Sequence, residues 1–199
     1  LIPIEKFKWL VLIEFSSVED SKDEKDKIES ILNKILNENL AKDIFIAQSL
    51  KQTKNMWNIR ESISEAQKKE GGSIKNDISI PIKDISKFIS SAIKISKEVI
   101  PGSRCVVFGH IGDGNIHFNI SQPVKADKDK FLKKEKALRK EIINLTLDLK
   151  GSISAEHGIG ITRKADLKKY MKKDVEVFKS IKKSFDPKNI MNPGKVIDI

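Results

Sequence analysis

The 199-residue sequence predicts an α+β fold, with a mainly antiparallel sheet and helices packed on one face. Short apolar runs of strand length alternate with longer segments whose apolar residues recur at helical spacing. Segments 104–110 and 115–121 are predicted to form a β-hairpin, because the Gly-Asp-Gly sequence between them favours a tight turn that joins antiparallel strands. Hydrophobic residues make up 39% of the chain and charged residues 33%, which is typical of a globular chain with a buried core.

The remaining elements follow from apolar periodicity and from residues that begin or end helices. A capping box at Ser21–Glu24 begins the first helix, whose apolar stripe runs from Ile28 to Leu40. Gly71-Gly72 ends the second helix, and Pro101-Gly102 ends the third. The second and third helices are expected over 51–70 and 84–99, and two further helices over 127–150 and about 175–185. Strands are expected over 8–15, 43–48, 77–82, 104–110 and 115–121.

The overall composition argues against several classes of protein. The net charge is +10, but only four of the 38 cations are arginines and no basic stretch alternates with aromatics, so we expect no nucleic-acid partner. No apolar run approaches the ~20 residues of a membrane span. The single Cys105 cannot form an intramolecular disulfide. The chain begins without Met, inside an apparent strand, and we therefore expect a preceding domain.

All three histidines lie in two glycine-rich motifs, at 109–119 and 151–160. Six of the ten glycines lie in the same two segments. Imidazole is the commonest metal ligand and the usual acid or base near neutral pH, and glycine allows sharp turns and close approach of the backbone. These motifs are therefore where we expect the chemistry.

The hairpin would bring His110, at the end of one strand, beside His117, at the start of the next. Two imidazoles and a carboxylate form a common metal triad, and Glu156 in the second motif is the obvious third ligand. His157 would then be free to act as a general base. Asp113 is a second candidate ligand, although Asp in a Gly-Asp-Gly turn is more often a turn residue. A polar hairpin without metal is the alternative interpretation.

The two motifs resemble the C-terminal domain of FAD-linked oxidases, the flavoenzymes of the vanillyl-alcohol oxidase type. The ending at 186–195 and the Trp57–Glu61 segment are also similar to this family, so the resemblance covers nearly the whole chain. The most similar members are D-2-hydroxyacid dehydrogenases that act on D-lactate, glycolate or D-2-hydroxyglutarate. The resemblance implies oxidation of such a 2-hydroxy acid to the 2-oxo acid, with hydride transfer to flavin.

The resemblance also implies roles for individual residues. His110, His117 and Glu156 match positions that bind a divalent metal, usually zinc or manganese. His157 matches the catalytic base, and Asn119 matches a substrate contact.

Three further substrate-binding residues follow from the resemblance. Arg60 matches an arginine that pairs with a substrate carboxylate, for which the bidentate guanidinium is suited. Ser64 and Lys75 match substrate-contacting positions of the D-2-hydroxyglutarate members, where the first position is a threonine. Ala155 stands where many members have glycine.

The resemblance implies FAD as cofactor, bound by an N-terminal domain outside residues 1–199. No dinucleotide fingerprint occurs here, since Gly112 and Gly114 lack the third glycine and the following helix. We therefore expect residues 1–199 to be the substrate and metal domain and to be inactive alone. The expected partners are a small 2-hydroxy acid, the FAD domain, an electron acceptor and a second copy in a homodimer. We expect a bacterial cytoplasmic location, at the inner membrane if the electron acceptor lies there.

Two other functions remain open on the residues alone. A metal-assisted hydrolase using His110, His117, Glu156 and His157 would work without flavin. A non-enzymatic basic module would bind nucleic acid with strong salt dependence.

Overall fold

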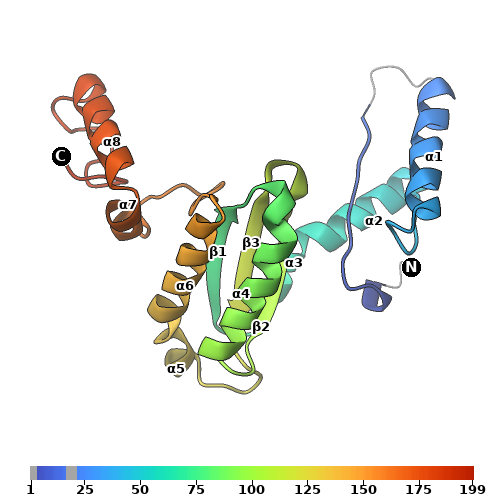
Figure 1. Ribbon diagram of the computed structural model, residues 1–199, viewed down its shortest axis with the longest axis horizontal. Helices are drawn as coiled ribbons and strands as arrows, with labels where there is room; N and C mark the ends of the chain where they lie inside the picture. The colour runs from blue at the N-terminus through green and yellow to red at the C-terminus, as the bar shows by residue number, and fades with distance from the viewer. Residues whose placement is uncertain (1–3, 17–21) are drawn as a thin grey trace. The chain divides into compact units, whose positions relative to one another are not determined.

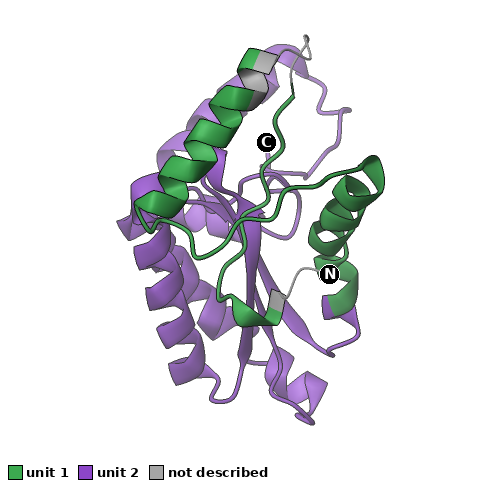
Figure 2. Cartoon of the chain, turned by 90° about the vertical axis from the view of Figure 1, so that its right-hand side faces the viewer, with its two compact units in different colours: residues 1–66 green, residues 67–199 purple. Residues whose placement is uncertain are grey.

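The computed structural model describes residues 4–16 and 22–199. The chain divides into two compact units, Leu1–Ala66 and Gln67–Ile199, and each is described by itself (Figure 2). The capping box that begins at Ser21 lies partly outside the described residues.

The first unit contains a short 3-10 helix η1 (Ile4–Lys6), α1 (Lys22–Asn37), α2 (Leu50–Glu61) and the start of α3 (Ile63–Lys68). Ser49 caps α2, since its Oγ accepts a hydrogen bond from the Gln52 N–H. The predicted helix over 51–70 is thus two helices, which meet at Ser62.

The predicted strands over 8–15 and 43–48 are wrong. Both segments are described, and neither pairs with a strand among the described residues. Side chains hold them instead: the Trp57 indole N–H donates to Glu14, and Phe7 meets Phe45 edge to face at 6.2 Å. An apolar run indicates side chains that favour burial, but a strand also needs a neighbouring strand for its backbone hydrogen bonds.

The second unit is built on a three-stranded antiparallel sheet of β1 (Ser73–Ser79), β2 (Arg104–His110) and β3 (Asn115–Ser121), in the order β1-β3-β2 (Figure 1). The predicted hairpin of β2 and β3 is confirmed, with a 3-10 turn η3 (Ile111–Asp113) between the strands. β1 begins before the predicted 77–82 strand and ends earlier, since Pro81 has no N–H for a ladder. A 3-10 turn η2 (Ile82–Asp84) follows.

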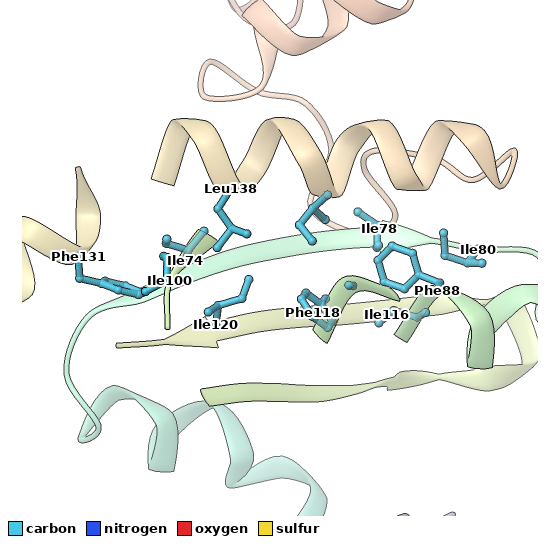
Figure 3. Packing of buried hydrophobic residues seen from close by; sticks show 12 residues of the cluster. Ile74, Ile78, Ile80, Phe88, Ile100, Ile116, Phe118, Ile120, Phe131 and Leu138 are labelled. Atoms are coloured by element: carbon cyan, nitrogen blue, oxygen red, sulfur yellow. The ribbon is translucent and has the colours of Figure 1, made fainter. Parts of the chain in front are cut away.

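Two helices, α4 (Ile85–Val99) and α6 (Glu135–Asp148), cover one face of the sheet (Figure 1). Alternate residues of the strands point into this layer, as the period of a strand requires. Figure 3 shows the core between sheet and helices. Its buried members are Ile74, Ile78, Ile80, Phe88, Ala92, Ile100, Ile116, Phe118, Ile120, Phe131, Leu138 and Ile142. The predicted α+β class, with helices on one face of an antiparallel sheet, is confirmed.

The other helices are α5 (Lys128–Leu132), α7 (Lys164–Tyr170) and α8 (Lys172–Phe185). The helix expected over 127–150 is divided into α5 and α6, and α7 was not predicted. None of the helices among the described residues is both long and apolar enough to cross a membrane.

Asp186 holds the turn that follows α8. Its two carboxylate oxygens accept hydrogen bonds from the Ile190 and Met191 N–H groups, both at 2.9 Å, and Lys182 pairs with the same carboxylate. The hydrogen bond from Lys182, together with these backbone donors, holds the pKa of Asp186 below its ordinary value of 3.8.

Phe118→Ala should destabilise the second unit by about 3–5 kcal/mol. The ring is fully buried and meets Phe88 edge to face at 5.8 Å, so its removal leaves a cavity beneath α4. Urea denaturation measures the change. A loss below about 1 kcal/mol would contradict this description of the core.

Asp186→Asn should reduce stability at neutral pH and have little effect in acid. A carboxyl whose pKa is depressed on folding stabilises the fold above its ordinary pKa, and this stabilisation is lost as the pH falls through the folded pKa. The difference in Tm between wild type and variant should therefore shrink below about pH 4. An equal difference in Tm at pH 7 and pH 3 would refute a stabilising role for the charge of Asp186.

Candidate metal and substrate site

The candidate site lies on the sheet face opposite α4 and α6. Because Ile74, Ile78 and Phe118 face the helices, the residues directly next to them along each strand face the other way. The ladder register sets these residues in rows across β1, β3 and β2. The rows are Lys75, Asn119 and Val106; then Asp77, His117 and Phe108; then Ser79, Asn115 and His110.

The second glycine-rich motif reaches this face through a short bridge to β1. Ser79 and Ser152 exchange two backbone hydrogen bonds, of 3.1 and 2.9 Å. A Cβ on Gly151 would lie 2.3 Å from the Ser79 carbonyl oxygen, so the approach requires glycine here. The bridge brings the loop at 154–157 beside the middle of β1.

Asp77 connects this loop to β1 through hydrogen bonds. Its Oδ2 accepts hydrogen bonds from three successive N–H groups, those of Ala155 at 3.3 Å, Glu156 at 2.9 Å and His157 at 2.8 Å. Burial raises the pKa of the Asp77 carboxyl, but the backbone donors and the two nearby histidines lower the pKa by more. The carboxylate is therefore ionised at neutral pH.

The structure places Glu156, the predicted carboxylate ligand, near each of the two predicted histidine ligands. The Glu156 carboxylate has its Oε2 3.4 Å from His117 Nε2 and its Oε1 3.9 Å from His110 Nε2. Ligand atoms around a tetrahedral zinc ion with bonds of about 2.1 Å lie about 3.4 Å apart. The distance between Glu156 and His117 is of this size. The group of potential ligand atoms that lie within 4.8 Å of one another among the described residues, however, does not include His110.

The compact group of ligand atoms among the described residues includes Asp77, which was not predicted. One atom from each of Asp77, His117, Glu156 and His157 lies within 4.8 Å of the others. His157 has an exposed ring with its centroid 5.6 Å from that of His117. Asp77 was missed from the sequence. The only available signal was a carboxylate within an apolar strand, beside Ile78 and Ile80.

Asn119 lies on the same face as His117, as predicted, and is buried. Its Nδ2 donates to Gln67 Oε1 at 2.9 Å. Gln67 Nε2 in turn donates to the hydroxyls of Ser73 and Ser121, which fixes the orientation of both amides. Gln67 was not predicted, because this network joins residues 52 and 54 positions apart.

Lys75 is exposed and lies beside Asn119 in the ladder. It borders a pocket of about 260 Å³ that also contains Lys68 and Lys128. This arrangement suits an anionic group.

Arg60 and Ser64 belong to the first unit. Arg60 is half-buried in the last turn of α2, and Ser64 is exposed on α3, beyond the break at Ser62. Their approach to the histidines stays a prediction. Asp113 Oδ1 accepts a hydrogen bond from the Asn115 N–H at 3.0 Å, as expected for a turn residue.

Residues 3–196 match the family of FAD linked oxidases, C-terminal domain. The chain belongs to this family. The D-2-hydroxyglutarate dehydrogenase of Stutzerimonas stutzeri is 40% identical over 156 residues, which is 77% of this chain and 33% of that protein. The mitochondrial enzyme of the same name from Arabidopsis thaliana is 36% identical over 191 residues, 95% of this chain and 32% of the relative. The chain thus spans about a third of the length of these relatives.

A probable mitochondrial D-2-hydroxyglutarate dehydrogenase of Oryza sativa subsp. indica is 36% identical over 198 residues, 98% of this chain and 34% of the relative. The family predicted from the two glycine-rich motifs is confirmed.

Gly109→Ala should disrupt the β2–β3 hairpin, whereas Gly112→Ala should be tolerated. A Cβ on Gly109 would lie 2.1 Å from the Asn115 carbonyl oxygen, while a Cβ on Gly112 meets no atom within 4 Å. Overpacking of this kind costs about 1–3 kcal/mol. Thermal unfolding of both variants measures the difference. Equal Tm values would show that the hairpin does not need the close approach.

Proposed function

We propose that this chain is the substrate and metal domain of an FAD-dependent dehydrogenase that oxidises a D-2-hydroxy acid to the 2-oxo acid. Family membership and relatives named D-2-hydroxyglutarate dehydrogenase support this proposal and make D-2-hydroxyglutarate the first substrate to test. D-lactate and glycolate are the comparison substrates. In this proposal FAD is bound by a domain outside residues 1–199.

One observation carries the metal-assisted part of the proposal: the Glu156 carboxylate lies between the Nε2 atoms of His110 and His117. Two imidazoles and a carboxylate suit zinc or manganese and leave coordination positions for a substrate oxygen. The site is open enough for this, since the side chains of His110 and Glu156 are about half exposed.

In the proposed mechanism, bound metal would lower the pKa of the substrate hydroxyl, and flavin would accept the hydride from C2. A ring nitrogen of His157 accepts the hydroxyl proton. The exposed ring has room to meet a substrate, and its backbone N–H is held by Asp77. Loss of one proton and one hydride converts the 2-hydroxy acid to the 2-oxo acid.

Substrate orientation is assigned to the polar groups beside this centre. Lys75 neutralises a carboxylate, and Asn119 hydrogen-bonds a substrate oxygen from its fixed amide. Binding of the substrate carboxylate by Arg60 and Ser64 remains a prediction from the resemblance. A homodimer, the electron acceptor and a cytoplasmic location remain predictions from the sequence.

Metal analysis combined with turnover tests the proposal. The protein that includes the FAD domain, loaded with flavin and purified without chelators, should hold about one divalent ion per chain and should reduce a dye acceptor with D-2-hydroxyglutarate. The double variant His110→Ala/His117→Ala should lose the ion, and its kcat/KM should fall about 100-fold or more.

The matched control is Asp113→Asn, which keeps an oxygen for the turn and removes the carboxylate that lies between the two histidines in the sequence. It should retain both metal and activity. A metal-free wild type, or a double variant that keeps its ion, would refute the metal-assisted part. Ester hydrolysis without flavin would favour a hydrolase instead.

A further inference from the structure

The two oxygens of Asp77 face different partners. Oδ2 accepts the three N–H groups of the loop at 155–157. Oδ1 is buried, has no hydrogen-bond partner in the part of the chain that the structure describes, and lies 3.6 Å from His117 Nδ1. A buried carboxylate oxygen without a donor is costly, so a nearby ring N–H is the natural partner.

The His117 ring lies between two carboxylates. Its Nδ1 is 3.6 Å from Asp77 Oδ1, and its Nε2 is 3.4 Å from Glu156 Oε2. A proton on Nδ1, directed at Asp77, leaves a lone pair on Nε2, directed at the side of the ring where Glu156 lies. Metal-binding histidines commonly donate their second ring nitrogen to a carboxylate in this way.

We propose that Asp77 is a positioning residue, which through one oxygen holds the loop that carries Glu156 and His157 and through the other sets the ring of His117. This inference rests on the proposed metal site and deepens it. Asp77 thereby couples the two glycine-rich motifs, whose separate chain segments each supply part of the ion's ligands.

Direct coordination by Asp77 is the competing role, because its carboxylate also lies in the four-residue cluster. Three N–H donors already surround Oδ2, and a metal bond at this atom would displace them. An ion at Oδ1 would meet His117 at Nδ1, whereas Glu156 lies at the opposite ring nitrogen, Nε2. The hydrogen-bonding pattern therefore favours positioning over coordination.

Hydrogen exchange of the metal-free protein tests the hold on the loop. Asp77→Ala removes the acceptor, so the amides of residues 155–157 should exchange at least about 10-fold faster, while the β3 amides stay protected. Asp186→Ala is the matched control, since Asp186 is also a buried carboxylate that accepts loop N–H groups. It should leave residues 155–157 unchanged. Unchanged exchange in a folded Asp77→Ala protein would overturn the loop-holding role.

Cobalt titration tests the effect on His117, with Co²⁺ alone as the probe. Asp77→Asn keeps a carbonyl oxygen for the loop but turns an NH₂ group toward His117 Nδ1, which favours the ring form with its proton on Nε2. Affinity for Co²⁺ should fall about 10–100-fold, with one ion still bound at saturation and an unchanged visible spectrum. His117→Ala, in contrast, should change the spectrum.

Two results would overturn the positioning role: wild-type affinity in Asp77→Asn, or a spectrum altered as by loss of a ligand. A wild-type protein that binds no cobalt would refute the metal site itself. The exchange experiment would then decide separately whether Asp77 holds the loop.

Discussion

One buried carboxylate joins the two parts of the candidate site. Asp77, in the centre of β1, accepts three backbone N–H groups from a loop about 80 positions later in the chain. The ionised oxygen meets dipoles that are fixed by the loop backbone, and these dipoles offset part of the cost of its burial. The Ser79–Ser152 bridge is a second contact that holds this loop against β1.

The two faces of the sheet have different roles, one in stability and the other in the candidate site. One face is apolar and packs beneath α4 and α6, while the other carries Asp77, His117 and Asn119 in register. Since strand residues alternate, three short strands serve both purposes. The rigid apolar layer holds the backbone of the polar face, and polar groups such as Gln67 then fix individual side chains.

The sequence predicted what depends on local signals. The β2–β3 hairpin follows from a turn motif, and strand alternation places His110 and His117 on the same face of it. Asp77 and Gln67 could not be predicted, because their partners lie 52 to 80 positions away and neither stands in a distinctive motif. The strands expected over 8–15 and 43–48 failed for a related reason: apolarity is local, whereas a ladder needs a partner.

X-ray absorption spectroscopy of the zinc-loaded protein tests the central claim most directly, because it counts the imidazoles bound to the ion. The arrangement of Glu156 between His110 and His117 predicts two imidazoles, with one lost in His110→Ala and none lost in His157→Ala. Loss of an imidazole in His157→Ala, with the count unchanged in His110→Ala, would contradict it and favour the cluster of Asp77, His117, Glu156 and His157.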